Sequence, residues 1–326
     1  MKLTRRKAIK ALTGGLAASA LMGFPSVLRA ATSIKVGTIK VPHWAAVWEL
    51  GNYVPAGTTI ELVEFKTSLE MIAAFTANNL DVATIGYWHA VRMLDQGANV
   101  QGLAGICSKG SRLIVRPGLT LGGWKELRGK TCAVARGSTQ DLQFLLALKS
   151  NGLTVGDINY RDLGGNMAVH VSALQQHQAD TSAMWEPFAS QAIQQGLGTE
   201  LSGLYEGSFT ANGVMVASSD TISKRRDEVQ AVVSAQVKST NALTGDPDKF
   251  LALAIKLSGF NRETMVMANQ NTVLEYILRM SDARKIATVA NQVGYAKSDV
   301  GSKLGQAFNY TFLSAATGKK AEELGA

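Results

Sequence analysis

A turn at residues 137–139 has the residue types of a small anion-binding site. The mostly apolar run before it, 130–135, predicts a buried strand, and Gly137 ends that run. Ser138 or Thr139 then offers a hydroxyl at the N-cap of a helix that Asn151-Gly152 terminates. Free backbone N–H groups at such a turn and the positive end of the helix dipole both favour negative charge. Many α/β proteins contain this turn for structural reasons, so the turn alone leaves both roles open.

The elements that would position this turn alternate between strand and helix. The hydrophobic pattern predicts strands at 34–39, 59–65, 81–85, 100–106, 113–115, 130–135, 158–163, 181–185 and 214–217. Helices lie between most of these strands, and from residue 222 onward the pattern predicts helices only. Such alternation argues for mostly parallel sheets flanked by helices. We expect two lobes, one formed by residues 31–115 with 219–326 and the other by residues 116–218.

Aromatic and polar residues gather where five of the predicted strands end. In open α/β sheets, ligands bind outside the carboxyl ends of the strands. Any one of these side chains is equally well explained by core packing, but together they favour a binding site. We therefore predict a ligand-binding set consisting of Pro42, His43, Trp44, Gly86, Tyr87, Trp88, Gly137, Ser138, Thr139, Asn166, Trp185 and Glu186.

Glu186 bears on the charge of the ligand. Two like charges about 4 Å apart repel by roughly 4 kcal/mol at an effective dielectric near 20. A site for a bare anion would therefore need Glu186 turned away, protonated or paired with an arginine. Alternatively, Glu186 accepts hydrogen bonds from an amine, amide or amino-pyrimidine, and nearby aromatic rings wall the site. A third interpretation is that Glu186 caps the helix that begins at Pro187.

The first thirty residues predict an export signal. A basic segment, 4–10, precedes an apolar stretch, 11–28, and the small residues Ala30-Ala31 mark an expected cleavage point. Arg5-Arg6 resembles a twin-arginine signal. The whole chain has 33 Lys and Arg against 25 Asp and Glu, and six of the basic residues lie in 1–30. The mature chain then has 27 basic and 25 acidic residues, which gives no argument for nucleic-acid binding.

Other chemistry has weaker support in the sequence. The four His and two Cys residues show no metal-ligand spacing, and no motif predicts a cofactor. Cys107 and Cys132 are consistent with a disulfide or with two buried thiols, and their expected positions in different lobes favour thiols. An exported lyase or hydrolase remains the alternative function, although the spacing of Ser138, His43 and Glu186 does not support a catalytic triad.

Five short motifs, in order, resemble the periplasmic solute-binding proteins of ABC importers that serve nitrate, sulfonates, taurine and thiamine-precursor pyrimidines. They are Asp81-Val-Ala-Thr-Ile-Gly86, Trp124-Lys-Glu-Leu-Arg-Gly-Lys130, Ala135-Arg-Gly-Ser138, Leu174 with Ala179-Asp180, and Trp185-Glu-Pro-Phe188. The resemblance implies the type II periplasmic binding fold, with two lobes that trap a small-molecule ligand near residues 137–139 and 185–187. It implies delivery to an ABC permease in the inner membrane. We accordingly expect a monomeric binding protein of the periplasm that is no enzyme and has no cofactor.

Overall fold

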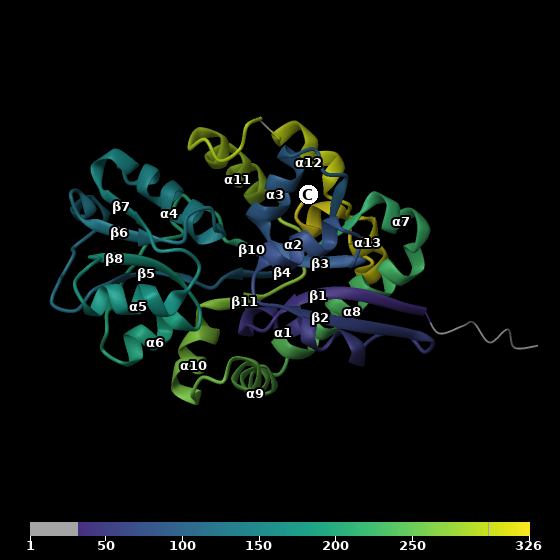
Figure 1. Cartoon of the computed structure of the whole chain (residues 1–326). Coiled ribbons are helices and arrows are strands. Elements are labelled where there is room, and N and C mark those ends of the chain that lie inside the picture. Colours follow the sequence, from purple (N-terminus) through teal and green to yellow (C-terminus); the bar gives the residue numbers. More distant parts are fainter. Residues whose placement is uncertain (1–31, 299) are drawn as a thin grey trace, which may run out of the picture. The chain divides into compact units, whose positions relative to one another are not determined.

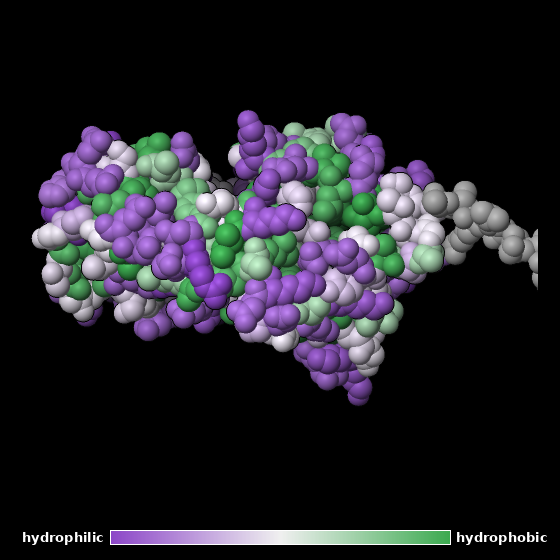
Figure 2. All heavy atoms as spheres, turned by 90° about the horizontal axis from the view of Figure 1, so that it is seen from below, coloured by the Kyte–Doolittle hydropathy of each residue, from purple (hydrophilic) through white to green (hydrophobic). Residues whose placement is uncertain are grey.

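Two β-sheets organise residues 32–298 and 300–326, which are the residues that the computed structural model describes (Figure 1). The predicted export signal at 1–30 lies outside them. Within the described ranges, no helix combines the length and the apolar character needed to cross a membrane. On the face drawn in Figure 2, hydrophilic residues are spread widely and apolar residues form smaller groups among them.

The six-stranded sheet has the order β11-β4-β10-β3-β1-β2. Strand β1 is parallel to β2 and β3, whereas β10 is antiparallel to β3 and β4, and β11 is antiparallel to β4. Four of the six strands, β1 to β4, therefore run in one direction. The bounds are β1 (Thr32–Ile39), β2 (Thr58–Phe65), β3 (Val82–Gly86), β4 (Val100–Lys109), β10 (Ala211–Ser218) and β11 (Thr272–Leu274).

The five-stranded sheet has the order β7-β6-β8-β5-β9. Its bounds are β5 (Ser111–Val115), β6 (Thr131–Val134), β7 (Asn159–Asp162), β8 (Thr181–Trp185) and β9 (Thr199–Leu201). Only β5 opposes the other four strands, because β6 is parallel to β7 and β8 and β5 is antiparallel to β8 and β9. Both sheets are thus mixed and mostly parallel in direction, as predicted.

Helices cover both sheets (Figure 1). Their apolar positions follow the predicted spacing: in α8, Val229, Val232, Val233 and Val237 are all buried. The α-helices are α1 (Ala45–Trp48), α2 (Ser68–Thr76), α3 (Tyr87–Asp95), α4 (Thr139–Ser150), α5 (Met167–Gln175), α6 (Phe188–Gln194), α7 (Ser219–Lys224), α8 (Arg226–Thr244), α9 (Pro247–Ser258), α10 (Arg262–Gln270), α11 (Met280–Gln292), α12 (Gly301–Ala307) and α13 (Thr311–Thr317). The 3-10 helices are η1 (Pro42–Trp44), η2 (Leu50–Asn52), η3 (Trp124–Leu127), η4 (Val155–Asp157) and η5 (Ala321–Leu324).

Sheet membership differs from the expected lobe boundaries at both ends. Strand β5 belongs to the five-stranded sheet, although residues up to 115 were expected in the other lobe. Strand β10 belongs to the six-stranded sheet, although residues up to 218 were expected in the second lobe. The chain passes between the sheets at Gly110, whose φ of +80° suits glycine, and again between β9 and β10. The local sequence pattern does not predict which sheet a strand joins, because β10 has the same apolar character as the other buried strands.

Two short strands were not predicted. The region after residue 222 was expected to be all helical, yet β11 (Thr272–Leu274) pairs with β4. Strand β9 (Thr199–Leu201) pairs with β5. Each has three residues, which is too short for a period of two to be recognised. Cys107 on β4 and Cys132 on β6 lie in different sheets, and both are buried free thiols, as the sequence favoured.

Candidate functional site

The carboxyl ends of strands from both sheets open on one cavity of about 340 Å³. Ile39 at the end of β1 and Gly86 at the end of β3 line it from the six-stranded sheet. Ala135 after β6 and Trp185 at the end of β8 line it from the five-stranded sheet. Asn212 joins them because β10 runs antiparallel, so that its first residues lie beside the last residues of β3 and β4.

Three α-helices begin at this cavity. Helix α2 starts after its N-cap Thr67, and α4 starts after its N-cap Ser138; each cap oxygen accepts a backbone N–H of the first turn. Helix α3 starts after Gly86, which has no side chain with which to cap it. All three cap residues line the cavity. Converging helix N-termini place positive dipole ends and unpaired N–H groups around one volume, which favours a bound anion.

The charged side chains at the cavity have one sign. Lys66 and Arg136 line it, whereas none of the described lining residues is Asp or Glu. The guanidinium of Arg136 lies over the ring of Tyr160, 5.0 Å from the ring centroid, which restricts where that cation can move. The electrostatic potential of the cavity is therefore suited to an anion and unsuited to a cation.

Two histidines line the cavity in their neutral form. Burial lowers the pKa of His43 to about 4 and that of His89 to about 4, so that both imidazoles are uncharged at neutral pH. The Nδ1 atom of each ring is buried and has no hydrogen-bond partner among the described residues. His43 packs edge-on against Trp44, whose indole N–H donates to Thr84 Oγ1 at 2.8 Å. The indole is thus held as a fixed apolar wall.

The turn at 137–139 has the conformation that the sequence predicted, but two of its backbone N–H groups already donate to acceptors within the protein. Gly137 has φ of +74°, and its N–H donates to Asp141 Oδ2 at 2.8 Å. The N–H of Ser138 donates to the carbonyl of Ala135 at 3.1 Å, and Ser138 Oγ accepts from Asp141 N at 3.1 Å. The N–H groups of Thr139 and the following residue lie in the first turn of α4, where no preceding helical carbonyl can accept them. Those later N–H groups are the ones available to an anion.

Seven of the twelve predicted site residues line the cavity, and these are His43, Trp44, Gly86, Gly137, Ser138, Thr139 and Trp185. Four of the other five have different roles. The hydroxyl of Tyr87 accepts from the N–H of Arg279 at 2.9 Å, and Trp88 is buried against Tyr295. Pro42 is buried at the first position of η1, and exposed Asn166 caps α5 by accepting from Ala168 N at 3.1 Å.

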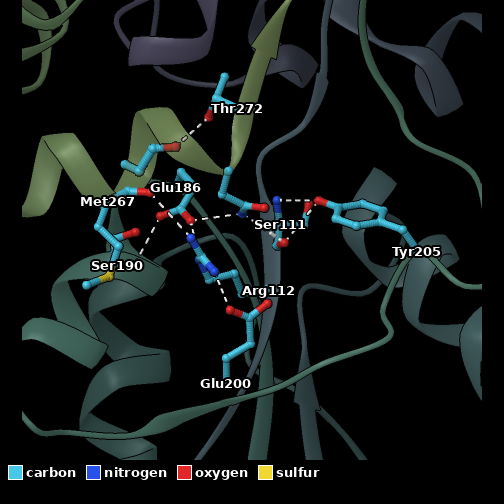
Figure 3. A network of polar contacts seen from close by, with 10 residues as sticks. Ser111, Arg112, Glu186, Ser190, Glu200, Tyr205, Met267 and Thr272 are labelled. Atoms are coloured by element: carbon cyan, nitrogen blue, oxygen red, sulfur yellow. Dashed lines mark hydrogen bonds and ion pairs between the residues drawn. The ribbon is translucent and has the colours of Figure 1, made fainter.

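Glu186, the fifth, is fully buried outside the cavity lining at the centre of the network in Figure 3. Its Oε1 accepts from Arg112 Nε at 2.7 Å and from Asn271 Nδ2 at 2.9 Å. Its Oε2 accepts from Ser190 N at 3.0 Å, in the first turn of α6. Arg112 also pairs with Glu200. Two of the alternatives that the sequence offered are therefore true together: Glu186 pairs with an arginine and also caps a helix. Its carboxylate accepts all these hydrogen bonds from within the protein.

Several lining residues were not predicted. Lys66, Thr67 and Ser68 follow the end of β2, so the strand-end rule that found the other turns applied to them as well. Arg136 directly precedes the predicted turn, and its charge is a signal for anion binding. Asn212 had no such signal, because the direction of β10 is set by its partners. Among the described residues, no group of three or more His, Cys, Asp and Glu side chains is placed to hold a metal ion.

Comparison with known proteins gives a family and a fold. The sequence model of the NMT1-like family matches residues 29–257. No curated protein sequence matches the chain. Similar solved structures include the alkanesulfonate-binding protein SsuA from Xanthomonas axonopodis pv. citri bound to MOPS, with a TM-score of 0.73 and 18% identity over 85% of this chain and 98% of that one.

The periplasmic aliphatic sulphonate binding protein SsuA from Escherichia coli has a TM-score of 0.73 and 18% identity over 86% of this chain and 98% of that one. The periplasmic nitrate-binding protein NrtA from Synechocystis PCC 6803 has a TM-score of 0.69 and 13% identity over 88% of each chain. At such low identities the likeness establishes the fold alone. The predicted type II periplasmic binding fold is confirmed.

Proposed function

The chain belongs to the NMT1-like family, and from this and its fold we propose that it is the solute-binding component of an ABC importer. Its ligand would be a small organic anion of the sulfonate, aromatic-acid or pyrimidine type. The observation that carries the proposal is the cavity, where three helix N-termini, Lys66 and Arg136 meet and where no described lining residue is a carboxylate. Trp44 and Trp185 provide apolar surface for the body of such a ligand.

An anion suits this cavity better than a zwitterion such as taurine, whose amine is one of the groups considered above as a partner of Glu186. A zwitterion needs an acceptor for its ammonium group, and Glu186 was the candidate. In the structure that carboxylate already accepts from Arg112, Asn271 and Ser190. A ligand ammonium would be desolvated beside Lys66 and Arg136 with no carboxylate to pair with it among the described lining residues, which is costly. Alkanesulfonate and nitrate, named for the similar solved proteins, are both anions.

Capture would involve movement of two lobes about the two crossings between the sheets, at Gly110 and between β9 and β10. Gly86 at the start of α3 and Thr139 at the start of α4 approach each other at the cavity: a Cβ on Gly86 would lie 2.8 Å from Thr139 Oγ1. The two lobes thus touch beside the proposed ligand. Ligand binding would favour this closed arrangement by its differential affinity for the closed state.

The cell biology of the proposal follows from the first thirty residues. We also propose that the chain is exported through the twin-arginine pathway and cleaved near Ala30-Ala31. It would then act as a periplasmic monomer together with an inner-membrane permease. Replacing Arg5-Arg6 by Lys-Lys should stop export, and cell fractionation measures this. Normal export of that variant would exclude the twin-arginine route while leaving a signal sequence possible. Recovery of bound ligand chemically unchanged would exclude the lyase or hydrolase alternative.

Ligand screening tests the binding role. We expect hexanesulfonate or benzoate to raise the melting temperature more than taurine does. Arg136→Gln should weaken binding of the best anion about tenfold, as expected for loss of one charge-assisted contact. Lys224→Gln is the control, since Lys224 is an exposed cation on α7 that pairs only with Asp220 among the described residues. Stabilisation by taurine alone, or equal binding by the Arg136 variant, would contradict the proposed ligand class.

A further inference from the structure

Asp141 has a fully buried carboxylate that accepts a hydrogen bond from Gly137, in the turn at residues 137–139 that is called the ligand turn below. It lies in the first turn of α4 and is not among the residues that line the cavity. Its Oδ2 accepts from Gly137 N at 2.8 Å and from the Tyr295 hydroxyl at 2.8 Å. Its Oδ1 accepts from the Tyr160 hydroxyl at 2.5 Å. The position of the turn at Gly137 therefore depends on where Asp141 is held.

The two tyrosines reach Asp141 from different halves of the molecule. Tyr160 lies on β7, in the same five-stranded sheet whose strand β6 precedes the turn. Tyr295 follows α11, and its ring lies 6.3 Å from that of Trp88 on α3. Asp95 at the end of α3 fixes the chain just after Tyr295, because its carboxylate accepts from Lys297 N at 3.0 Å and from Ser298 N at 2.9 Å. Tyr295 is thus anchored to the half that contains the six-stranded sheet.

Both hydroxyls are present as donors over the physiological pH range. Burial, reinforced by the nearby Asp141 charge, raises the pKa of Tyr160 well above its usual value and that of Tyr295 to about 12. A hydrogen bond from a neutral hydroxyl to a buried carboxylate is charge-assisted and stronger than a neutral one. The Tyr160–Asp141 bond lies within one half and survives any lobe movement, whereas the Tyr295–Asp141 bond crosses between the halves and requires them to be close. The two hydroxyl oxygens also lie 3.1 Å apart across the halves. Because each hydroxyl has one proton and donates it to Asp141, this contact adds no further hydrogen bond.

We propose that Tyr295 is a positioning residue for the ligand turn, which holds Asp141, and through it Gly137, only when the two halves are closed. The inference rests on the proposed capture of an anion by lobe closure. Tyr295 is not among the described residues that line the cavity, and its hydroxyl adds stability to the closed arrangement alone, with or without ligand. Its loss should therefore appear as faster ligand release. By the same reasoning, loss of the Tyr160 hydroxyl weakens the open and closed states equally.

Tyr295→Phe and Tyr160→Phe form a matched pair, because each removes one hydroxyl from the same carboxylate. With hexanesulfonate, or benzoate if it binds more tightly, Tyr295→Phe should raise both the dissociation rate and Kd about tenfold, as expected for one hydrogen bond to a charged group. Tyr160→Phe should lower the melting temperature and leave the dissociation rate within about twofold of the wild-type value. Equal dissociation rates in the wild type and the Tyr295 variant would overturn the proposal.

Amide hydrogen exchange without ligand separates this inference from the proposed function. Tyr295→Phe should speed exchange at both 137–143 and 293–298, because one bond joins these segments across the halves. Tyr160→Phe should speed exchange at 137–143 and leave 293–298 unchanged. Should no anion bind the wild type, the solute-binding proposal fails while the exchange result still decides whether the bond couples the halves. An effect of Tyr295→Phe that is confined to 293–298 would show that Tyr295 has only a local structural role.

Discussion

Replacing Glu186 by glutamine should destabilise the fold and leave anion affinity unchanged. Removing one partner of a buried ion pair costs about 3–5 kcal/mol. Glutamine has nearly the same size and keeps one oxygen for Arg112 and Asn271, but its NH₂ group cannot accept from Ser190 N. Arg112 also keeps Glu200 as a partner. The expected loss in free energy of unfolding is therefore at the low end, about 3 kcal/mol.

Urea unfolding and a thermal scan would measure this loss. At about 2–4 °C per kcal/mol, it corresponds to a fall of roughly 6–12 °C in Tm. Glu200→Gln is the control within the same network, since its side chain is 34% exposed and its pair with Arg112 should contribute at most about 1 kcal/mol. Calorimetric titration with hexanesulfonate should give the same Kd for both variants and the wild type. Unchanged stability with a several-fold weaker Kd in Glu186→Gln would refute the reasoning, since Glu186 would then have to contact the ligand.

Two further predictions concern the cavity. Gly86 has φ of −65°, which alanine also adopts, but an added Cβ would lie 2.8 Å from Thr139 Oγ1 in the closed form. Gly86→Ala should therefore weaken anion binding about tenfold. Titration of the Gly86→Ala/Thr139→Ala double variant should show recovered affinity, and no recovery would contradict the contact. His43 and His89 stay neutral in the folded protein down to about pH 4, whereas in the unfolded chain they take up protons below about pH 6.5, the ordinary pKa of histidine. Their contribution to the free energy of unfolding should therefore be complete above pH 6.5 and should fall as the pH drops toward 4. Urea unfolding across that range should show a shallower fall in His43→Gln, and an equally steep fall would rule out His43 as a cause.

Much of the secondary structure could be predicted from sequence because the signals are local. The fully buried strand β3 and the spaced apolar face of α8 follow directly from the periods of strands and helices. Ser138, one of the two predicted candidates, caps α4, since an N-cap depends only on a hydroxyl and the next few backbone N–H groups. The strand-end rule also predicted Gly86, the turn at 137–139 and Trp185, all of which line the cavity, because parallel strands end at the same edge of a sheet.

The sequence by itself thus determined where most strands, helices and turns form, and it predicted a binding site at the turns that follow strand ends. Only the tertiary structure decided which surfaces meet. Arg112 and Glu186 are 74 residues apart, and neither position shows the other as its partner until β5 and β8 pair. Trp88 lies just after β3 and Trp185 is the last residue of β8, yet Trp88 is buried against Tyr295 and Trp185 lines the cavity. The reason is physical: backbone periods and caps depend on neighbours in the chain, whereas the direction a side chain faces and the partner of a charge depend on contacts between segments far apart in it.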